Sequence, residues 1–308
     1  MRTRARRVFP LVPRRRLVGV PFGEQPTPRR GHGSDIAGSR PYEHGDPVST
    51  IDWPASARLS AAQGMDQFLV HTRFRDESPR AVVVSDRRPA MALYAPPLPW
   101  LSKRDALAAA VRVIADSTIA ARAELGYLDL GAGLPYWLPP GSRGKLGLLE
   151  RRRSDVDAFD APEDNVGRAL EFLARRRRDL PPGTFVFVLS DFVVRPSRAT
   201  LARAIAARWD LVPVVIQDPT WEQSFGDVAG VVVPVFDPAR ADVFAVRMTR
   251  REARERRDAN EERLRDLLGL FARLGLDPVV LGTSEPPKIL AAFLAWAERR
   301  RLARRARR

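Results

Sequence analysis

Three runs of apolar residues constrain the fold of this chain most strongly. They are rich in β-branched side chains and span residues 81–84, 185–189 and 211–216. Continuous apolar runs of this length are typical of strands that are buried on both faces of a parallel sheet. Between them, residues 103–123 and 166–173 carry apolar side chains at helical spacing. This alternation predicts an α/β fold, with a mostly parallel sheet and helices on both faces.

Weaker patterns complete this outline. They predict strands at residues 67–74, 125–130 and 279–281, and a hairpin at a sheet edge formed by residues 231–236 and 243–246. Residues 17–41 and 131–144 are rich in Gly and Pro, which predicts irregular structure. Ser102 and Thr249 each stand three residues before an acidic side chain, the spacing of a capped helix N-terminus.

Residues 40–58 hold the densest group of chemically distinctive side chains, in the order R-P-Y-E-H-G-D-P-V-S-T-I-D-W-P-A-S-A-R. Gly45, Asp46 and Pro47 predict a sharp, rigid turn. After the turn, Ile51 and Trp53 alternate with Asp52, which predicts a strand with the carboxylate on one face. We expect Arg58 to pair with Asp52, and Arg40 with Asp46.

The same stretch carries a family resemblance. The run R-x-Y-x-x-G-D-x-x-x-x-I-D-W-x-x-S-A-R resembles the signature of the bacterial family called domain of unknown function 58. Its residues in this chain are Arg40, Tyr42, Gly45, Asp46, Ile51, Asp52, Trp53, Ser56, Ala57 and Arg58. The resemblance extends over roughly residues 29–300, because the later apolar runs resemble that family's von Willebrand factor type A-like domain.

This resemblance implies a non-enzymatic interaction or adaptor domain. Its implied partner is a MoxR-type AAA+ ATPase, with which it would assemble or mature a client protein. We accordingly divide the chain into a basic, irregular N-terminal extension (residues 1–28), a signature segment packed on the main domain (29–78), the von Willebrand factor type A-like domain (79–298) and a basic C-terminal tail (299–308).

The resemblance also implies where a metal ion would bind. In von Willebrand factor type A domains the first strand continues as D-x-S-x-S, whose oxygen atoms hold Mg²⁺ together with residues of later loops. The corresponding positions here are Asp86, Arg88 and Ala90, with Asn165 and Asp191 in the later loops. A guanidinium in place of an oxygen ligand repels a divalent cation. We therefore expect a degenerate metal site without Mg²⁺, and no other cofactor.

The charge of +15 is concentrated at the two ends of the chain. Seven arginines lie in residues 1–16 and seven in residues 299–308, so the intervening chain carries a charge of only about +1. Basic tails attach to lipid headgroups or phosphate backbones without sequence choice. We therefore expect no specific nucleic-acid partner, and at most a peripheral contact with a membrane.

Two alternatives to the adaptor hypothesis remain open at this stage. One is a hydrolytic enzyme that uses Asp46, Asp52 and one of the histidines, although the chain lacks a G-x-S-x-G nucleophile motif. The other is binding of an anionic surface through the arginine-rich tails. The chain also lacks cysteine, and its longest clean apolar stretch, residues 289–297, is far shorter than a membrane span. These features lead us to expect a cytoplasmic protein.

Overall fold

The computed structural model describes residues 8–14, 30–43, 46, 48–74, 79–93, 101–141, 146–154, 159–237 and 242–306. The chain divides into two compact units, which we call unit 1 (residues 1–14 and 80–308) and unit 2 (residues 15–79). Each unit is built around a sheet of its own, and unit 1 contains a second, smaller sheet.

Unit 1 contains a six-stranded sheet with the order β10-β7-β6-β3-β4-β5. Its strands are β3 (Arg80–Ser85), β4 (Glu124–Asp129), β5 (Tyr136–Leu138), β6 (Phe185–Ser190), β7 (Asp210–Ile216) and β10 (Val279–Leu281). Every neighbouring pair is parallel except β4 and β5. The central strands β3 and β6 are almost entirely buried, as their continuous apolar runs require. The predicted α/β fold is confirmed.

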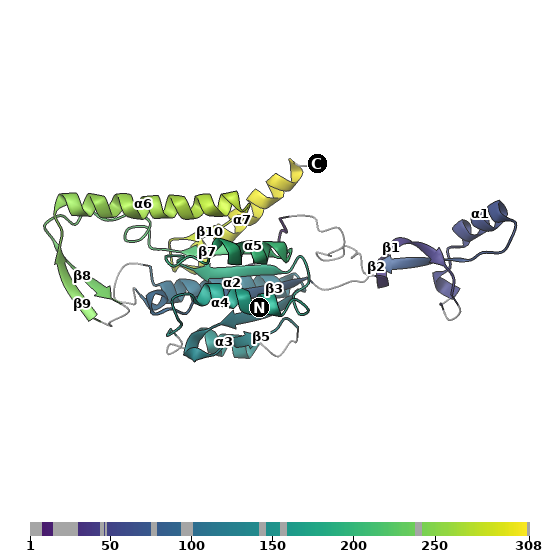
Figure 1. Ribbon diagram of the computed structural model, residues 1–308, viewed down its shortest axis with the longest axis horizontal. Coiled ribbons are helices and arrows are strands. Elements are labelled where there is room, and N and C mark those ends of the chain that lie inside the picture. The colour runs from purple at the N-terminus through teal and green to yellow at the C-terminus, as the bar shows by residue number, and fades with distance from the viewer. Residues whose placement is uncertain are drawn as a thin grey trace, which may run out of the picture. The chain divides into compact units, whose positions relative to one another are not determined.

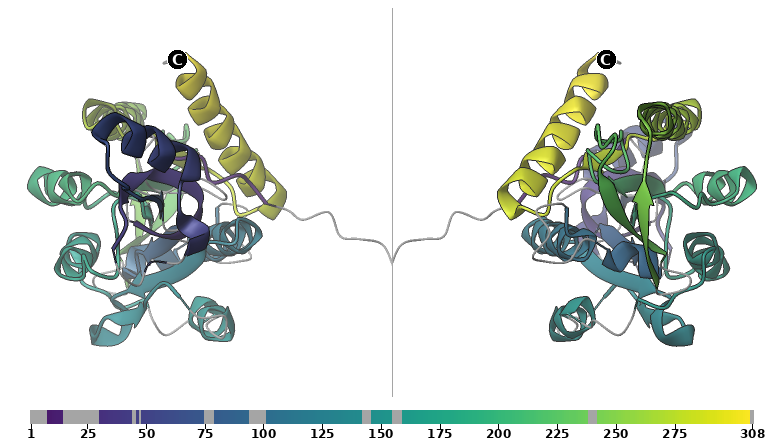
Figure 2. Two further views of the ribbon diagram at one scale, coloured as in Figure 1. Left: turned by 90° about the vertical axis from the view of Figure 1, so that its right-hand side faces the viewer. Right: turned by 90° about the vertical axis from the view of Figure 1, so that its left-hand side faces the viewer.

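Helices cover both faces of this sheet (Figures 1 and 2). One face packs against α4 (Asn165–Arg175), α5 (Arg198–Ala206) and α6 (Arg250–Arg273), through a core that includes Val82, Val186, Leu170, Leu201 and Phe271. On the other face lie α2 (Lys103–Ala120) and α7 (Pro286–Arg305), which contact each other. The remaining helix is α3 (Leu146–Ser154), with short 3-10 turns η2 (Pro89–Ala92) and η3 (Gly131–Gly133). Among the helices that the structure describes, none has the combination of length and hydropathy that a membrane span requires.

Both ends of the chain differ from the predicted basic extensions. In the N-terminal segment 8–14, Phe9 is buried and stacks on Phe293 of α7 with ring centres 4.7 Å apart. At the other end, α7 continues through Arg305, so the tail predicted to begin at residue 299 is helical over most of its length. Arg300 is buried and pairs with Asp210 at 2.9 Å, because α7 turns this side chain toward the sheet. Most of the predicted basic C-terminal tail therefore belongs to α7.

Unit 2 contains β1 (Arg30–Pro41) paired antiparallel with β2 (Leu69–Phe74), together with η1 (Val48–Thr50) and α1 (Trp53–Gln63). The prediction that residues 30–41 are irregular was wrong, because β1 pairs along this stretch. The predicted strand at Ile51–Trp53 was also wrong, since Trp53 begins α1 and Ile51 forms only an isolated bridge with Val70. Asp52 caps α1 and Pro54 lies in its first turn, two helix-starting signals that outweigh a short alternation.

Two further predictions concern short strands of unit 1. The hairpin of β8 (Val232–Asp237) and β9 (Asp242–Arg247) forms a sheet of its own rather than an edge of the main sheet. The loop predicted at residues 131–144 contains β5, whose Trp137 packs against Phe172 of α4. The pairing of β5 with β4 therefore goes together with tertiary packing, whereas β8 and β9 pair locally with each other.

Candidate functional site

The candidate site lies at the carboxyl ends of β3 and β6. Asp86 follows β3 and Asp191 follows β6, so two adjacent parallel strands bring both carboxylates to the same edge of the sheet. Both residues are buried. The Ser190 hydroxyl donates a hydrogen bond of 2.6 Å to Asp86 Oδ2, which ties the ends of the two strands together.

Arg88 bridges these two carboxylates. Its Nη2 lies 2.7 Å from Asp86 Oδ2 and also pairs with Asp191 Oδ1, while its Nε donates to Asp86 Oδ2 at 3.0 Å. The side chain is only 2% exposed. Burial lowers the pKa of Arg88. Its hydrogen bonds to Asp86 and the charges of Asp86 and Asp191 raise the pKa by more than burial lowers it, so the pKa lies above its usual value. The guanidinium is therefore a permanent internal cation.

Two other predicted site positions flank this bridge. Asn165, the first residue of α4, donates from Nδ2 to Asp86 Oδ1 at 3.0 Å and to Pro162 O at 3.0 Å. Ala90 lies in the η2 turn and contributes no side-chain oxygen. The structure thus brings Asp86, Arg88, Asn165 and Asp191 together, and Ala90 adds nothing polar to them.

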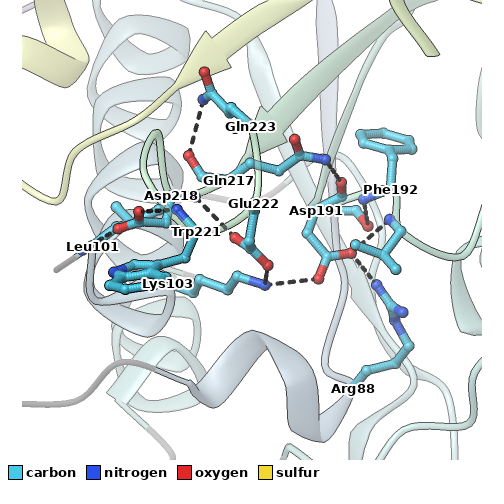
Figure 3. Close-up of polar contacts among 12 residues, drawn as sticks. Arg88, Leu101, Lys103, Asp191, Phe192, Gln217, Asp218, Trp221, Glu222 and Gln223 are labelled. Carbon is cyan, nitrogen blue, oxygen red and sulfur yellow. Dashed lines mark hydrogen bonds and ion pairs between the residues drawn. The ribbon is translucent and has the colours of Figure 1, made fainter. Parts of the chain in front are cut away.

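A second internal cation, Lys103, was missed by the sequence analysis. Its Nζ lies 2.9 Å from Asp191 Oδ2 and also pairs with Glu222 Oε1 (Figure 3). The Lys103 side chain is 1% exposed, although it stands at the first position of α2. A cation at a helix N-terminus opposes the helix dipole, and this unfavourable placement was the one sequence signal for its role.

Lys103, Asp191 and Glu222 shift one another's pKa values. Burial lowers the pKa of Lys103, but Asp191 and Glu222 raise it above its usual value. Burial raises the pKa of Asp191, whereas Lys103 and Arg88 lower it more, and the result lies below the usual value. The pKa of Glu222 is raised, mainly by burial. Asp191 is therefore the carboxylate that these two cations hold in its charged form.

Hydrogen bonds connect this site with α6. Gln217 Nε2 donates to the carbonyl of Asp191 at 2.5 Å, and Gln223 Nε2 donates to the carbonyl of Gln217 at 3.0 Å (Figure 3). Arg263 of α6 donates from Nη2 to the carbonyl of Glu222 at 2.7 Å. The loop after β7 therefore joins the buried ion pairs to the longest helix of unit 1.

A similar cluster closes the end of the neighbouring strand β4. Asp129 Oδ1 pairs with Arg152 Nη2 at 2.5 Å, and Asp129 Oδ2 lies 3.5 Å from Arg87 Nε. Arg87 also donates to the hydroxyl of Tyr127 at 3.2 Å. Burial raises the pKa of Tyr127, and the charge of Asp129 raises it further. The acids at this edge of the sheet are thus neutralised from within the chain.

These contacts limit the chemistry of the site. Asp86, Asp129 and Asp191 all have arginine or lysine partners at hydrogen-bond or ion-pair distance. Among the residues that the structure describes, no three His, Cys, Asp or Glu side chains converge as metal ligands. The donor set suits a structural ionic network better than a divalent cation, since a cation would have to displace Arg88.

A cavity of about 220 Å³ lies beside the site, between α4 and the start of α5. Charged and apolar side chains both line it, including Glu163, Arg168, Val194, Arg195 and Ser197. Glu163 Oε2 is 3.3 Å from Arg88 Nη1, so this cavity adjoins the bridged carboxylates. Phe192, just after Asp191, has a φ of 53°, a backbone conformation that is uncommon for a bulky residue.

Residues of the signature hold unit 2 together. The Asp52 carboxylate caps α1 by accepting from Ala55 N at 3.0 Å. The buried Ser56 hydroxyl donates to Asp52 O at 2.7 Å and accepts from Leu69 N at 2.8 Å, which fastens α1 to β2. Tyr42 N donates to Phe68 O at 2.8 Å. These contacts give the signature a clear structural role.

The remaining signature residues differ in position. Asp46 Oδ2 accepts from Glu43 N at 2.9 Å, as a turn residue does. Arg58 Nε donates to Pro54 O at 3.1 Å, within α1, so its predicted pairing with Asp52 was wrong. Ala57 is exposed on α1. Gly45 and the side chain of Arg40 lie outside the described residues. The predicted pair of Arg40 with Asp46 therefore also lies outside them.

Trp53 is the most distinctive surface residue of unit 2. Its side chain is 57% exposed and meets Phe68 edge to face, with ring centres 6.0 Å apart. Val48 and Met65 of the same unit are also exposed. Large exposed aromatic residues are typical anchors of protein interfaces.

Comparison with solved structures gives distant similarities. The conserved hypothetical protein BatB of Bacteroides thetaiotaomicron is 13% identical with a TM-score of 0.41, covering 72% of this chain and 100% of that one. An aerotolerance-related membrane protein of Bacteroides fragilis, with multiple mutations to serines, is 10% identical with a TM-score of 0.40 and the same coverage. The PilB minor pilin of Streptococcus sanguinis is 9% identical with a TM-score of 0.35, covering 76% of this chain and 64% of that one.

The comparison with protein families assigns the chain to a family, which the distant solved structures do not. The search of curated proteins found no match to this sequence. The family model described as Protein of unknown function DUF58 matches residues 38–266, a range that includes the signature, the bridged carboxylates and most of α6. Because this match covers well over half of the sequence, the chain belongs to the DUF58 family.

Proposed function

We propose that this protein is a non-enzymatic interaction domain that works with a MoxR-type AAA+ ATPase in the assembly or maturation of a client protein. Membership of the DUF58 family supports the choice of partner, because the resemblance of residues 40–58 to the signature of that family implies a MoxR-type ATPase. A partner that hydrolyses ATP places the protein where ATP is available, in the cytoplasm. Neither sequence-specific nucleic-acid binding nor a membrane contact beyond a peripheral one belongs to this proposal.

The observation that carries the proposal is the bridge of Arg88 between Asp86 and Asp191. In a von Willebrand factor type A-like domain this place belongs to a metal ion that binds a partner's carboxylate. Here the cation is a side chain already satisfied by two carboxylates. The domain would then recognise its partner through the surfaces around the sheet edge, without Mg²⁺ or another cofactor.

The roles of the signature carboxylates support a binding protein over a hydrolase. A hydrolase would need Asp46 and Asp52 to converge on a substrate with a histidine. Asp46 instead accepts a hydrogen bond in its own turn, and Asp52 caps α1. Both carboxylates therefore have structural roles that explain their presence.

Binding to the ATPase tests this proposal. We expect the full chain to bind the MoxR-type ATPase of the same genome with a Kd near or below about 1 μM in biolayer interferometry with a non-hydrolysable ATP analogue. Trp53→Ala should weaken binding at least tenfold, because an exposed aromatic side chain contributes most to an interface when it is covered. The thermal melting temperature should change little, since Trp53 is largely exposed.

The matched control is Val48→Ala, which removes a different exposed apolar side chain from the same unit. It should change the Kd less than threefold. A well-folded wild-type chain that binds no better than an unrelated AAA+ ATPase would contradict the proposal. So would hydrolysis of a substrate that disappears with Asp52→Asn.

A further inference from the structure

The hairpin of β8 and β9 is an unusual element of unit 1. The two strands pair antiparallel with each other, with Val233 opposite Val246 and Val235 opposite Phe244, and they belong to no larger sheet in the described structure. Their contacts are mainly with each other. Figure 1 shows the hairpin at the N-terminal end of α6. A two-stranded hairpin is marginally stable in water, so this one gains if a partner covers it.

Both faces of the hairpin are apolar. In the alternation of a strand, one face receives Val233, Val235, Phe244 and Val246, with Asp242 at its end, and the other receives Val232, Pro234, Val243 and Ala245, with Arg247 at its end. Val243 is 59% exposed, Val232 50% and Phe244 41%. A hairpin that only faced water would carry polar residues on at least one face. An exposed apolar patch of this kind marks an interaction surface.

The two edges of the hairpin differ. Proline has no N–H to donate, so a proline inside a strand turns its nitrogen toward the open edge. Pro234 pairs with Ala245, and this arrangement directs the backbone N–H and C=O of Ala245 to the outer edge of β9. By alternation, the backbone N–H and C=O groups of Val243 and Arg247 also point to this edge, where Val243 N donates to the Asp242 carboxylate at 2.8 Å. Pro234 leaves the outer edge of β8 without one backbone N–H donor, whereas β9 contains no proline and keeps an open edge.

Unpaired arginines stand at the end of β9. Arg247, Arg250, Arg254 and Arg256 are exposed and form no ion pair within the described residues, whereas their neighbour Arg251 pairs with Glu255 at 2.7 Å. The first three lie at the end of β9 and on the first turns of α6. Asp242 stands at the opposite end of β9. A ligand that lies along β9 therefore meets positive charge at one end only. A ligand with complementary charge carries acidic groups at that end.

We propose that β9 binds an extended segment of a protein partner, which adds to its open edge as a further strand. The segment is apolar at alternate positions, to cover the valines and Phe244, and carries Asp or Glu at the end that meets Arg247, Arg250 and Arg254. Backbone hydrogen bonds to Ala245 and Arg247, and to the carbonyl of Val243, supply affinity, and the acidic end fixes the direction of the strand. This inference is independent of the ATPase partnership.

Selection from a display library of random 12-residue peptides on the full chain tests it. Enriched peptides should combine alternating apolar residues with acidic residues at one end. In hydrogen exchange, a synthesised enriched peptide should slow the exchange of the amides of Ala245 and Arg247. Ala245→Pro, which removes an outward N–H, should weaken that peptide at least tenfold.

A charge-matched pair of variants keeps the test independent of hairpin folding. R247E/R250E/R254E should weaken the peptide at least tenfold, whereas R177E/R178E/R198E, the same charge change at exposed sites away from the hairpin, should change its Kd less than threefold. No enrichment, or binding that survives the first triple variant, overturns the proposal. So does light scattering that shows a dimer lost with Ala245→Pro, or β9-dependent binding of phosphatidylglycerol vesicles in place of peptides, because the occupant would then be a second copy or a lipid surface.

Discussion

The bridge of Arg88 shows how one side chain determines the charge balance of a sheet edge. Asp86 and Asp191 are buried, and two buried carboxylates cannot both stay charged without a cation. Arg88 supplies that cation to both and Lys103 supplies a second to Asp191. The buried charges of the edge are therefore fixed by side chains of the chain itself.

Removal of the bridging guanidinium should destabilise unit 1 strongly. We expect Arg88→Ser to lower the free energy of unfolding by about 3–5 kcal/mol, because it leaves buried carboxylates without their partner. Arg168→Ser is the control, since Arg168 pairs with Asp164 at 2.8 Å but its side chain is 60% exposed. That change should cost less than about 1 kcal/mol. Equal losses for the two variants in urea unfolding would contradict the account.

The acid dependence of stability should follow Asp191. The pKa of Asp191 in the folded chain lies below its unfolded value of about 4, so its contribution is present above that value and is lost as the pH falls through the folded pKa. The stability difference between wild type and Asp191→Asn should therefore shrink as urea unfolding is repeated at lower pH.

Glu222 provides the opposite case. Its pKa is raised in the folded chain, so its contribution is present below the unfolded pKa and is lost as the pH rises through the folded pKa. Stability relative to Glu222→Gln should accordingly fall as the pH rises above about 4.3. The two variants together separate these groups, and parallel pH profiles would disagree with the assignment.

Polar contacts fasten α1 to β2 in unit 2. Ser56 is the one buried residue of α1, and its hydroxyl links Asp52 O to Leu69 N. The alternation of Ile51 and Trp53 with Asp52 predicted a strand within the signature, whereas Trp53 begins α1. The helix forms there because Asp52 is a better cap than a strand residue.

Ser56→Ala should loosen α1 from β2. The Leu69 amide loses its acceptor, a loss that costs about 1–3 kcal/mol when the group is buried. We expect faster hydrogen exchange in residues 53–63 and 69–70, with unchanged exchange in the strands of the six-stranded sheet. Ser49→Ala, at an exposed position of the same unit, is the control and should change neither. Unchanged protection in Ser56→Ala would show that other contacts hold the helix.

At the scale of the whole molecule, the long-range rules of parallel sheets made much of the site predictable. Asp86 and Asp191 follow apolar runs on adjacent strands, and the carboxyl ends of such strands meet. Lys103 and Glu222 were not predictable in this way, because they approach from a helix and a loop whose positions depend on packing. The same holds for Phe9 and Arg300, which belong to arginine-rich ends yet lie in the core.

In our proposal, Arg88 and Lys103 take the place of a metal ion in partner recognition. Calorimetric titration of the full wild-type chain with Mg²⁺ and with Mn²⁺, near neutral pH, tests it most directly. We predict no saturable heat up to millimolar concentrations, because Arg88 already occupies the place between Asp86 and Asp191. Stoichiometric binding of either ion that is abolished by Asp86→Ala would contradict the account.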